Sequence, residues 1–279
     1  MWSMRKVKAR NMTALIVKIL VILLWAWVFF RWFEWRSLYA PTRGLESTPE
    51  DIGLAYEETR FMSEDGAALH GWWIPAEDAR GTVLFCHGNA GNMGDRLGTI
   101  KILNGMGVHV FIFDYRGYGR SRGLPTEKAT YRDARAAYEV VRARYENAEQ
   151  PPIVIMGRSL GGAVAVQLAK DRPARGLILE SCFTSTADMA RELYPWFPGR
   201  LCSFRYDSAS KMSDVRMPVL IAHSKADELI PFHMGRTLFE RTREPKQFFE
   251  LQDSHNAAPW ESTPRYAERL EAFLREVGL

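Results

Sequence analysis

From about residue 82 onward, short apolar runs alternate along the chain with longer stretches in which apolar positions recur at helical spacing. Runs of five or six apolar and β-branched residues are typical of parallel strands buried on both faces, and the longer stretches are typical of helices packed on the sheet. The predicted strands are Thr82–Cys86, Val108–Phe113, Pro152–Met156, Gly176–Glu180, Pro218–His223 and Gln247–Leu251. The predicted helices are Arg96–Met106, Thr126–Tyr145, Gly162–Ala169, Phe232–Arg243 and Trp260–Glu276. This alternation predicts an α/β fold with a mostly parallel central sheet and helices on both faces.

Two further segments, residues 57–62 and 68–74, flank the turn sequence Ser-Glu-Asp-Gly at 63–66. An Asp-Gly pair between two strand-like segments is a strong hairpin signal. We therefore expect an N-terminal antiparallel hairpin at the start of a globular domain that spans residues 55–279. Residues 44–54 are polar and form the expected linker before it.

The first 43 residues follow a different pattern. A short basic stretch precedes an apolar run, residues 13–30, that contains one charged residue and is about long enough to cross a bilayer as a helix. Lys18 lies near one end, where its side chain can extend to lipid headgroups. Tryptophans crowd the other end, as at a membrane interface; they are Trp25, Trp27, Trp32 and Trp35. Residues 1–43 are therefore expected to be a basic segment followed by one uncleaved transmembrane anchor.

Two other interpretations of this apolar run remain open. It could be a signal peptide cleaved after Ala40, although Pro41 and the bulky residues before Ala40 disfavour cleavage there. It could also be a buried core helix, which the flanking charges disfavour. Four Lys and Arg residues precede the run and three follow it. That bias favours a single-pass protein with its N-terminus in the cytoplasm and its globular domain outside.

The excess of positive over negative charge in the chain is confined to this N-terminal segment. Residues 1–43 carry eight Lys and Arg against one acid, Glu34, for a net charge of +7. The whole chain has a net charge of +4, so the remainder carries −3. A mildly acidic globular domain argues against a nucleic-acid partner.

Residues 182–215 contain no clear strand–helix unit and are rich in aromatic side chains. An insertion between two strands of a parallel sheet lies over the carboxyl edge, where ligands bind in such folds. We interpret it as a short helical cap with an apolar underside, in which Trp196 and Phe197 are candidate substrate-binding residues. Alternatively, these aromatic side chains only pack the insertion onto the domain.

Residues 157–161, with the sequence Gly-Arg-Ser-Leu-Gly, separate a predicted strand from a predicted helix. A serine at the apex of a strand–turn–helix is the arrangement of a nucleophile elbow, and the strained turn requires small residues such as Gly157 and Gly161 beside it. The positive end of the helix also favours negative charge that develops near the serine. Ser159 is therefore the candidate nucleophile. A glycine-rich turn with an incidental serine is the simpler alternative, but the strand and helix around the motif favour the elbow.

A serine hydroxyl needs a base to take its proton and an acid to orient that base. Asp227 follows the predicted strand 218–223, and His255 follows the predicted strand 247–251. The chain order serine, acid, histidine is the order expected for a nucleophile elbow of this kind. Asp227 is the candidate acid and His255 the candidate base, with Glu180 as an alternative acid. His223 is expected to order the acid loop.

Acyl transfer also needs hydrogen-bond donors aimed at the developing oxyanion. Residues 87–92, with the sequence His-Gly-Asn-Ala-Gly-Asn, follow the predicted strand 82–86, and their glycines allow close approach of a ligand. We place the two donors at the backbone N–H groups of Asn89 and Leu160, and we take His87 and Gly88 as candidate substrate-binding residues. A plain turn before the next helix is the alternative.

Three cysteines, Cys86, Cys182 and Cys202, form neither a metal-binding spacing nor a disulfide framework. Cys86 ends a predicted strand and is expected in the core. A Cys182–Cys202 disulfide stays open for an oxidising compartment. No metal site is expected.

Five motifs together resemble the α/β-hydrolase superfamily over about residues 55–278: 87–92, 114–121, 157–162, Asp227 with Leu229–Pro231, and 254–256. Within it the chain is similar to the membrane-anchored enzymes with a small cap, which include acyl-protein thioesterase-like and monoacylglycerol-lipase-like proteins and are often grouped with serine aminopeptidases. The resemblance implies an α/β-hydrolase fold, Ser159 as nucleophile, Asp227 as acid, His255 as base, and no cofactor. The serine at the elbow argues against haloalkane dehalogenase chemistry, which uses aspartate there.

The sequence thus predicts a membrane-anchored serine hydrolase that cleaves ester or thioester bonds of small-molecule or lipid-like acyl substrates. A serine aminopeptidase or amidase is an alternative. A membrane-tethered scaffold without turnover is another, and the complete Ser-Asp-His set argues against it.

Overall fold

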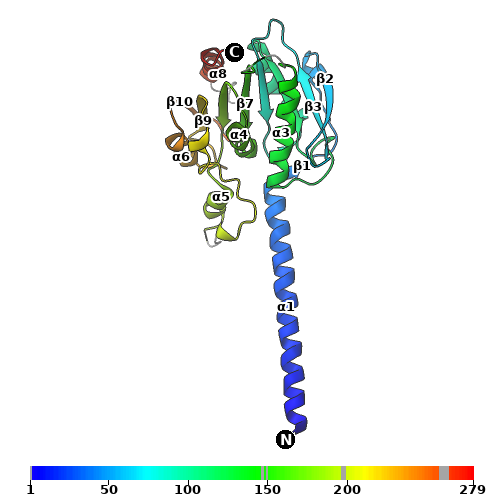
Figure 1. Cartoon of the computed structure of the whole chain (residues 1–279). Helices are drawn as coiled ribbons and strands as arrows, with labels where there is room; N and C mark the ends of the chain where they lie inside the picture. Colours follow the sequence, from blue (N-terminus) through cyan, green and yellow to red (C-terminus); the bar gives the residue numbers. More distant parts are fainter. Residues whose placement is uncertain (1, 146–147, 149, 196–198, 258–263) are drawn as a thin grey trace. The chain divides into compact units, whose positions relative to one another are not determined.

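The computed structural model describes residues 2–145, 148, 150–195, 199–257 and 264–279 (Figure 1). The chain divides into two compact units, Met1–Tyr39 and Ala40–Leu279. The first unit consists of one helix, α1 (Trp2–Leu38), and the second contains the sheet.

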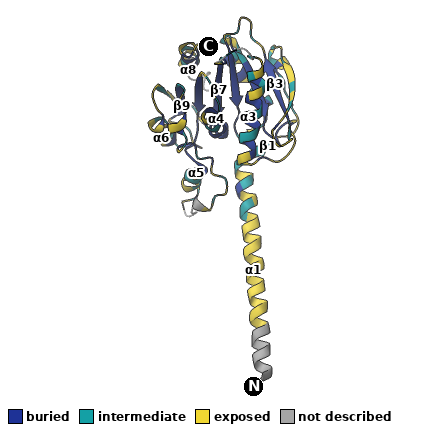
Figure 2. Cartoon of the chain, viewed as in Figure 1, coloured by how far each residue is buried: buried dark blue, intermediate teal, exposed yellow. Residues whose placement is uncertain are grey.

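Helix α1 is apolar over Asn11–Leu38, which is long enough to cross a membrane. At about 1.5 Å per residue, the 28 residues of this apolar span extend about 42 Å, which is more than the roughly 30 Å of a bilayer's hydrocarbon core. Its apolar side chains are largely exposed, as Figure 2 shows by their yellow colour. The predicted apolar helix is confirmed, although a signal sequence has the same length and character.

The second unit is built on an eight-stranded sheet with the order β10-β9-β8-β7-β4-β6-β3-β2. Strands β2 (Glu57–Met62) and β3 (Ala68–Ile74) form the antiparallel hairpin, and β3 also pairs antiparallel with β6 (His109–Asp114). All other pairings are parallel; the strands are β4 (Thr82–Cys86), β7 (Ile153–Arg158), β8 (Gly176–Glu180), β9 (Val219–Ser224) and β10 (Lys246–Leu251). The predicted hairpin and mostly parallel sheet are confirmed.

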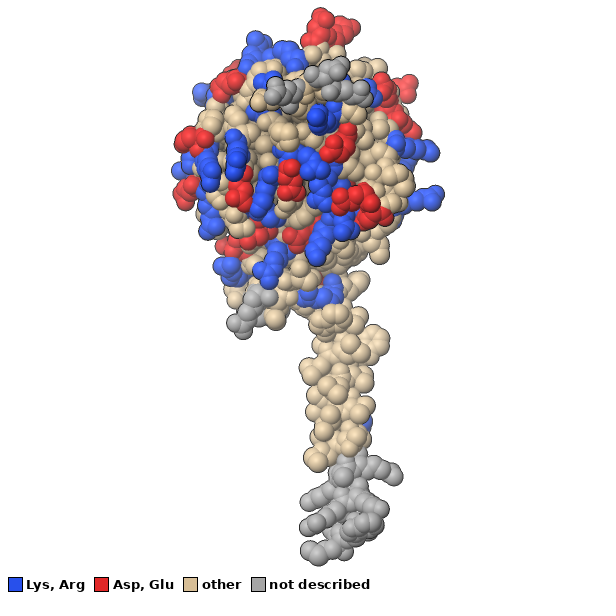
Figure 3. Space-filling model, in the orientation of Figure 1, with Lys and Arg blue, Asp and Glu red and all other residues tan. Residues whose placement is uncertain are grey.

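Helices cover both faces of the sheet, as predicted. On one face, α2 (Leu97–Gly105) and α8 (Pro264–Glu276) pack into the apolar core that contains Val83 and Phe85 of β4. On the other face lie α3 (Glu127–Ala143), α4 (Leu160–Asp171) and α6 (Phe232–Arg241). The inner strands of the sheet are largely buried, whereas the edge strands β2 and β10 are partly exposed. The visible surface of this unit carries both signs of charge intermixed (Figure 3).

Several helix ends differ from the predictions for local reasons. Arg96 ends a 3₁₀ helix, η2 (Met93–Arg96), instead of beginning α2. Thr126 is the N-cap of α3 and not its first residue, since its hydroxyl accepts a hydrogen bond from the N–H of Ala129. Helix α6 ends at Arg241 because Thr242 has an extended backbone. The predicted start of the last helix, Trp260, lies outside the described residues.

Residues 182–215 form a short helical insertion after β8, as predicted. It contains α5 (Thr186–Leu193) and the 3₁₀ helices η3 (Gly199–Leu201) and η4 (Met212–Asp214). The predicted linker contains another 3₁₀ helix, η1 (Pro49–Ile52). Just before it, β1 (Ala40–Pro41) pairs in parallel with β5 (Ala90–Gly91).

Candidate active site

Ser159 lies in the tight turn between β7 and α4. Its φ of 54° and ψ of −123° place it in a strained backbone region, as expected for a nucleophile elbow. A Cβ on Gly157 would lie 2.5 Å from the carbonyl oxygen of Gly161, and a Cβ on Gly161 would lie 2.0 Å from that of Cys86. Both glycines are therefore required by close backbone approach. Gly162, which the sequence did not single out, is equally enclosed, because its Cβ would lie 2.0 Å from Cys182 Sγ.

Asp227 occupies a structured loop after β9. Its Oδ1 accepts hydrogen bonds from the N–H groups of Leu229, at 3.0 Å, and Ile230, at 2.7 Å. The carbonyl of Ile230 lies 2.9 Å from His223 Nε2, so His223 holds the far side of this loop. The Asp227 carboxylate is fully buried. Two backbone donors and burial thus fix its second oxygen, Oδ2, in one direction.

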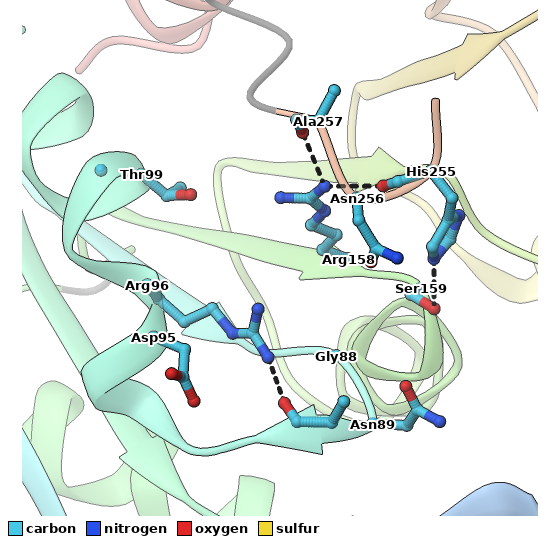
Figure 4. Close-up of a pocket in the computed structure, with 12 residues that line it drawn as sticks. Gly88, Asn89, Asp95, Arg96, Thr99, Arg158, Ser159, His255, Asn256 and Ala257 are labelled. Atoms are coloured by element: carbon cyan, nitrogen blue, oxygen red, sulfur yellow. Dashed lines mark hydrogen bonds between the residues drawn. The ribbon is translucent and has the colours of Figure 1, made fainter. Parts of the chain in front are cut away.

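His255 connects the other two residues. Its Nδ1 donates to Asp227 Oδ2 at 2.8 Å, and its Nε2 lies 3.2 Å from Ser159 Oγ (Figure 4). Burial alone would raise the pKa of Asp227, but the hydrogen bonds from His255 and Ile230 outweigh it and hold that pKa below its ordinary value. An ionised acid on Nδ1 leaves Nε2 as the proton acceptor toward Ser159. The structure therefore brings together the three residues that the sequence proposed for this role.

Arg158, the residue before Ser159, holds the His255 loop through hydrogen bonds to its backbone carbonyls. Its Nη2 donates to the carbonyls of His255, at 2.8 Å, and Ala257, at 3.1 Å. Its Nε forms an ion pair with Glu180 at 3.0 Å, and the other oxygen of Glu180 accepts from the hydroxyl of Tyr266 at 2.8 Å. The Glu180 carboxylate is thus directed at Arg158 and Tyr266, which excludes it as the acid partner of His255. The sequence did not indicate this role for Arg158.

Hydrogen bonds that its backbone carbonyl groups accept hold the loop after β4 in place. The carbonyl of Asn89 accepts from the hydroxyl of Tyr118 at 2.8 Å and from the N–H of Ala40 at 3.2 Å. The carbonyl of His87 accepts from the hydroxyl of Tyr115 at 3.0 Å. Gly88 and Asn89 line a cavity that also contains Ser159. Tyr115 and Tyr118 belong to a motif noted in the sequence, but their place beneath this loop is apparent only in the structure.

His87 differs from the expectation that it contacts substrate. Its ring is fully buried, with centroids 4.6 Å from that of Tyr115 and 5.4 Å from that of Tyr118. Its Nδ1 lies 2.8 Å from the carbonyl oxygen of Gly88. The side chain therefore supports the loop from inside the fold.

Leu160, the other proposed oxyanion donor, is the first residue of α4, where backbone N–H groups have no partner within the helix.

The cavity beside Ser159 and His255 has a volume of about 250 Å³. Its lining includes two arginines, Arg96 and Arg158, and one acid, Asp95. The sequence identified neither arginine as part of the site. Trp196 and Phe197, the candidate substrate-binding residues of the cap, lie outside the described residues.

Cys86 and Cys182 are buried free thiols, so the Cys182–Cys202 disulfide left open by the sequence is absent. Among the residues that the structure describes, no three His, Cys, Asp or Glu side chains are grouped to hold a metal ion.

Comparison with known proteins finds one matching family model and several relatives with similar sequences. A family model described as serine aminopeptidase, S33, matches residues 77–207. The uncharacterized protein Rv2307c of Mycobacterium tuberculosis is 35% identical over 257 residues, which cover 90% of this chain and 91% of that protein. The alpha/beta hydrolase domain-containing protein WAV2 of Arabidopsis thaliana is 37% identical over 227 residues, which cover 72% of this chain and 73% of that protein.

A solved structure of the Pyrococcus furiosus esterase Pf2001 superposes with a TM-score of 0.72 over 87% of this chain and 98% of that one. Its sequence identity is 20%, so this likeness concerns the fold alone.

Proposed function

The chain belongs to the α/β-hydrolase superfamily, and on that basis we propose that it is a serine hydrolase that cleaves carboxylic ester or thioester bonds of acyl substrates. One observation carries the proposal. Ser159 Oγ lies 3.2 Å from His255 Nε2, whose ring is held through Nδ1 by a buried Asp227. This is the relation that a nucleophile, its base and the orienting acid need.

The proposed reaction proceeds in two halves. Ser159 Oγ attacks the substrate carbonyl carbon while His255 Nε2 takes the hydroxyl proton, and the imidazolium then gives that proton to the departing alcohol or thiol. The acyl group is left on Ser159. A water molecule that loses a proton to His255 attacks this acyl-enzyme, and Ser159 regains its proton as the acid leaves.

The oxyanion of each tetrahedral intermediate is proposed to rest on the N–H groups of Asn89 and Leu160. Support comes from the carbonyl of Gly88, which belongs to the same peptide group as the N–H of Asn89 and lies 2.8 Å from His87 Nδ1. The next carbonyl, that of Asn89, accepts hydrogen bonds from Tyr118 and Ala40 and holds the same loop. Leu160 contributes the positive end of α4. Donors that are fixed before the reaction need no reorganisation when charge develops.

A serine aminopeptidase is the second candidate, and the description of the matching family model is what favours it. An aminopeptidase must accept a substrate ammonium group close to the scissile bond. The cavity instead carries Arg96 and Arg158, and the one acid in its described lining, Asp95, already accepts a hydrogen bond from the N–H of Asn92. Positive charge at this position favours ester or thioester substrates over free N-terminal amines.

Labelling with a fluorophosphonate probe tests the proposal. We expect covalent labelling of the wild-type chain and of the control Ser213→Ala, whose serine is exposed, and none of Ser159→Ala. Hydrolysis of 4-nitrophenyl esters should follow the same order, while amino-acid 4-nitroanilides should be poor substrates. Absence of labelling in the wild type would favour a scaffold without turnover, and efficient anilide cleavage would favour the aminopeptidase.

We also propose that α1 anchors the chain in a membrane, with the N-terminus in the cytoplasm and Ala40–Leu279 outside. The length and apolar character of Asn11–Leu38 support an anchor. Fractionation should place the full chain in membranes, and a chain that begins at Ala40 should be released. N-terminal sequencing of the mature protein separates an anchor from a cleaved signal sequence, and protease protection tests the orientation.

A further inference from the structure

We propose that Arg96 forms an anion-binding subsite beside Ser159, so that the preferred substrates carry a carboxylate or a phosphate close to the scissile carbonyl. The inference rests on the proposed hydrolase function and specifies its substrate class. It begins from an imbalance of charge in the cavity. Of the two arginines that line it, Arg158 forms an ion pair within the protein, and Arg96 forms none in the described part of the chain.

Arg158 is the ion-paired arginine. Its Nε pairs with Glu180, and its Nη2 is shared between two backbone carbonyls. Its side chain is 13% exposed and that of Glu180 is 1% exposed, so the pair is largely shielded from solvent. The charge and geometry of this guanidinium are therefore already used to hold the His255 loop.

Arg96 has no such partner. Its Nη2 donates to the carbonyl of Ala90, and its Nε is buried without a hydrogen-bond partner among the described residues. None of the ion pairs found in the described part of the chain includes Arg96. A buried guanidinium N–H without an acceptor is costly, and an anion in the cavity would remove that cost.

The one acid in the described lining, Asp95, forms no ion pair with Arg96 within the described part of the chain. Asp95 Oδ2 accepts the N–H of Asn92 at 2.8 Å, and it forms the reciprocal cap of η2 with that residue. This cap fixes the backbone from which Arg96 projects. Burial and the nearby positive charge of Arg158 lower the pKa of Arg96 and outweigh the negative charge of Asp95, which raises it. The net lowering agrees with a cation in poorly solvated surroundings.

The position of the subsite defines the substrate. Figure 4 shows the Arg96 side chain reaching from one wall of the cavity toward the wall that carries Ser159 and His255. A planar guanidinium suits the paired oxygens of a carboxylate or phosphate. An ester that reacts at Ser159 would therefore place its anionic group on the Arg96 side, as part of either the acyl group or the leaving group.

Two matched pairs of esters distinguish an anionic group on the leaving group from one on the acyl group. The first pair carries the charge on the leaving group: the butyrate ester of 4-hydroxybenzoic acid against that of methyl 4-hydroxybenzoate. The second carries it on the acyl group: mono(4-nitrophenyl) adipate against 4-nitrophenyl hexanoate. The measured quantity is the ratio of kcat/KM for the anionic and neutral members of a pair, determined with the full chain in nonionic detergent. A general loss of activity in a variant cancels from this ratio.

In at least one pair, Arg96→Gln should lower the ratio about tenfold or more relative to the wild type, the loss expected for a charge-assisted hydrogen bond. Arg96→Lys should retain more of the ratio than Arg96→Gln. Arg243→Gln, which changes an exposed arginine that precedes β10 at the opposite edge of the sheet, should leave the ratio unchanged. Equal ratios in the wild type and Arg96→Gln for both pairs would overturn the inference, even if every chain still reacts with a fluorophosphonate.

A binding measurement separates this outcome from failure of the proposed function. Titration of Ser159→Ala with inorganic phosphate needs no turnover. Binding should be at least tenfold weaker when Arg96→Gln is added, whereas equal affinities would count against the subsite. If the wild type hydrolyses no ester but phosphate binding depends on Arg96, the anion subsite stands and the proposed reaction does not.

Discussion

Nη2 of Arg158 lies 2.8 Å from the backbone carbonyl oxygen of His255, so the residue before the proposed nucleophile also holds the loop of the proposed base. The two residues are 97 positions apart in the chain. This contact, together with the ion pair to Glu180, connects the end of β7 to the loop after β10. The guanidinium of Arg158 therefore helps to set the relative position of Ser159 and His255, together with the hydrogen bonds of His255 to Asp227 and Glu228.

Replacement of Arg158 by Met should reduce kcat about tenfold to a hundredfold with little change in KM, because the His255 loop loses its anchor while the cavity remains open. Stability should also fall, by about 3 kcal/mol, since Glu180 is left buried and unpaired. The double variant Arg158→Met/Glu180→Met separates the two effects. Denaturant unfolding should show recovered stability, and steady-state kinetics should show activity still low. Recovery of both would mean that Arg158 serves stability alone.

Asp227→Asn should lower kcat about 10³–10⁴-fold, because the neutral amide no longer enforces the tautomer of His255 that accepts the serine proton. Its effect on stability should depend on pH. The folded-state pKa of Asp227 is lowered, so the ionised carboxylate stabilises the fold above its ordinary value of 3.8, and this contribution is lost as the pH falls through the lowered value. The difference in unfolding free energy between wild type and variant should therefore shrink as the pH is lowered from 6 to 3. A constant difference would contradict the assignment of an ionised, hydrogen-bonded Asp227.

Gly161→Ala should destabilise the chain by about 3 kcal/mol or more, because the added Cβ would meet the carbonyl oxygens of Cys86 and His87 at 2.0 and 2.4 Å. Gly105→Ala is the matched control at the end of α2, where a Cβ meets no atom within 4 Å. It should be neutral or stabilising by up to about 1 kcal/mol. Thermal unfolding of both variants checks the contrast, and comparable midpoints would show that the elbow can relax around a methyl group.

Tyr118→Phe should lower kcat by about tenfold, because the carbonyl of Asn89 loses its 2.8 Å hydrogen bond and the loop that carries the proposed oxyanion donor is held less firmly. Tyr138→Phe is a control that removes the same kind of contact, a 2.7 Å hydrogen bond to the carbonyl of Pro173. Both variants should lose about 1 kcal/mol of stability. If the two variants keep equal turnover of a 4-nitrophenyl ester, the Tyr118 hydroxyl has no special relation to the oxyanion loop.

The sequence revealed those parts of the site that depend on local pattern. Short apolar runs located the strands, and the required glycines located the turn at Ser159. Asp227 and His255 could be chosen because each directly follows a predicted strand, and the carboxyl ends of parallel strands share one edge of the sheet. Strand ends were displaced by about one residue, as in β9, because hydrophobicity marks a buried centre better than a hydrogen-bonded end.

The roles that escaped prediction depend on contacts between distant parts of the chain. Arg158 occupies a variable position of the elbow motif, and its partners lie at the end of β8 and after β10. Tyr118 supports a carbonyl 29 residues earlier in the chain. The sequence predicts a helix that begins at Arg96, and only the structure shows that this residue ends η2 and lines the same cavity as Ser159. No local spacing of residue types indicates such relations.

The pairing of β1 with β5 has a consequence for any cleavage that frees the sheet-containing unit. Ala40 is the first residue of that unit, and its N–H donates to the carbonyl of Asn89 at 3.2 Å. Proteolysis at Ala40 would preserve this bond, whereas proteolysis at Gly44 would remove it together with strand β1. Shed forms that differ by only four residues at their new N-termini would therefore differ in turnover, so the site of shedding would set the activity of the released enzyme.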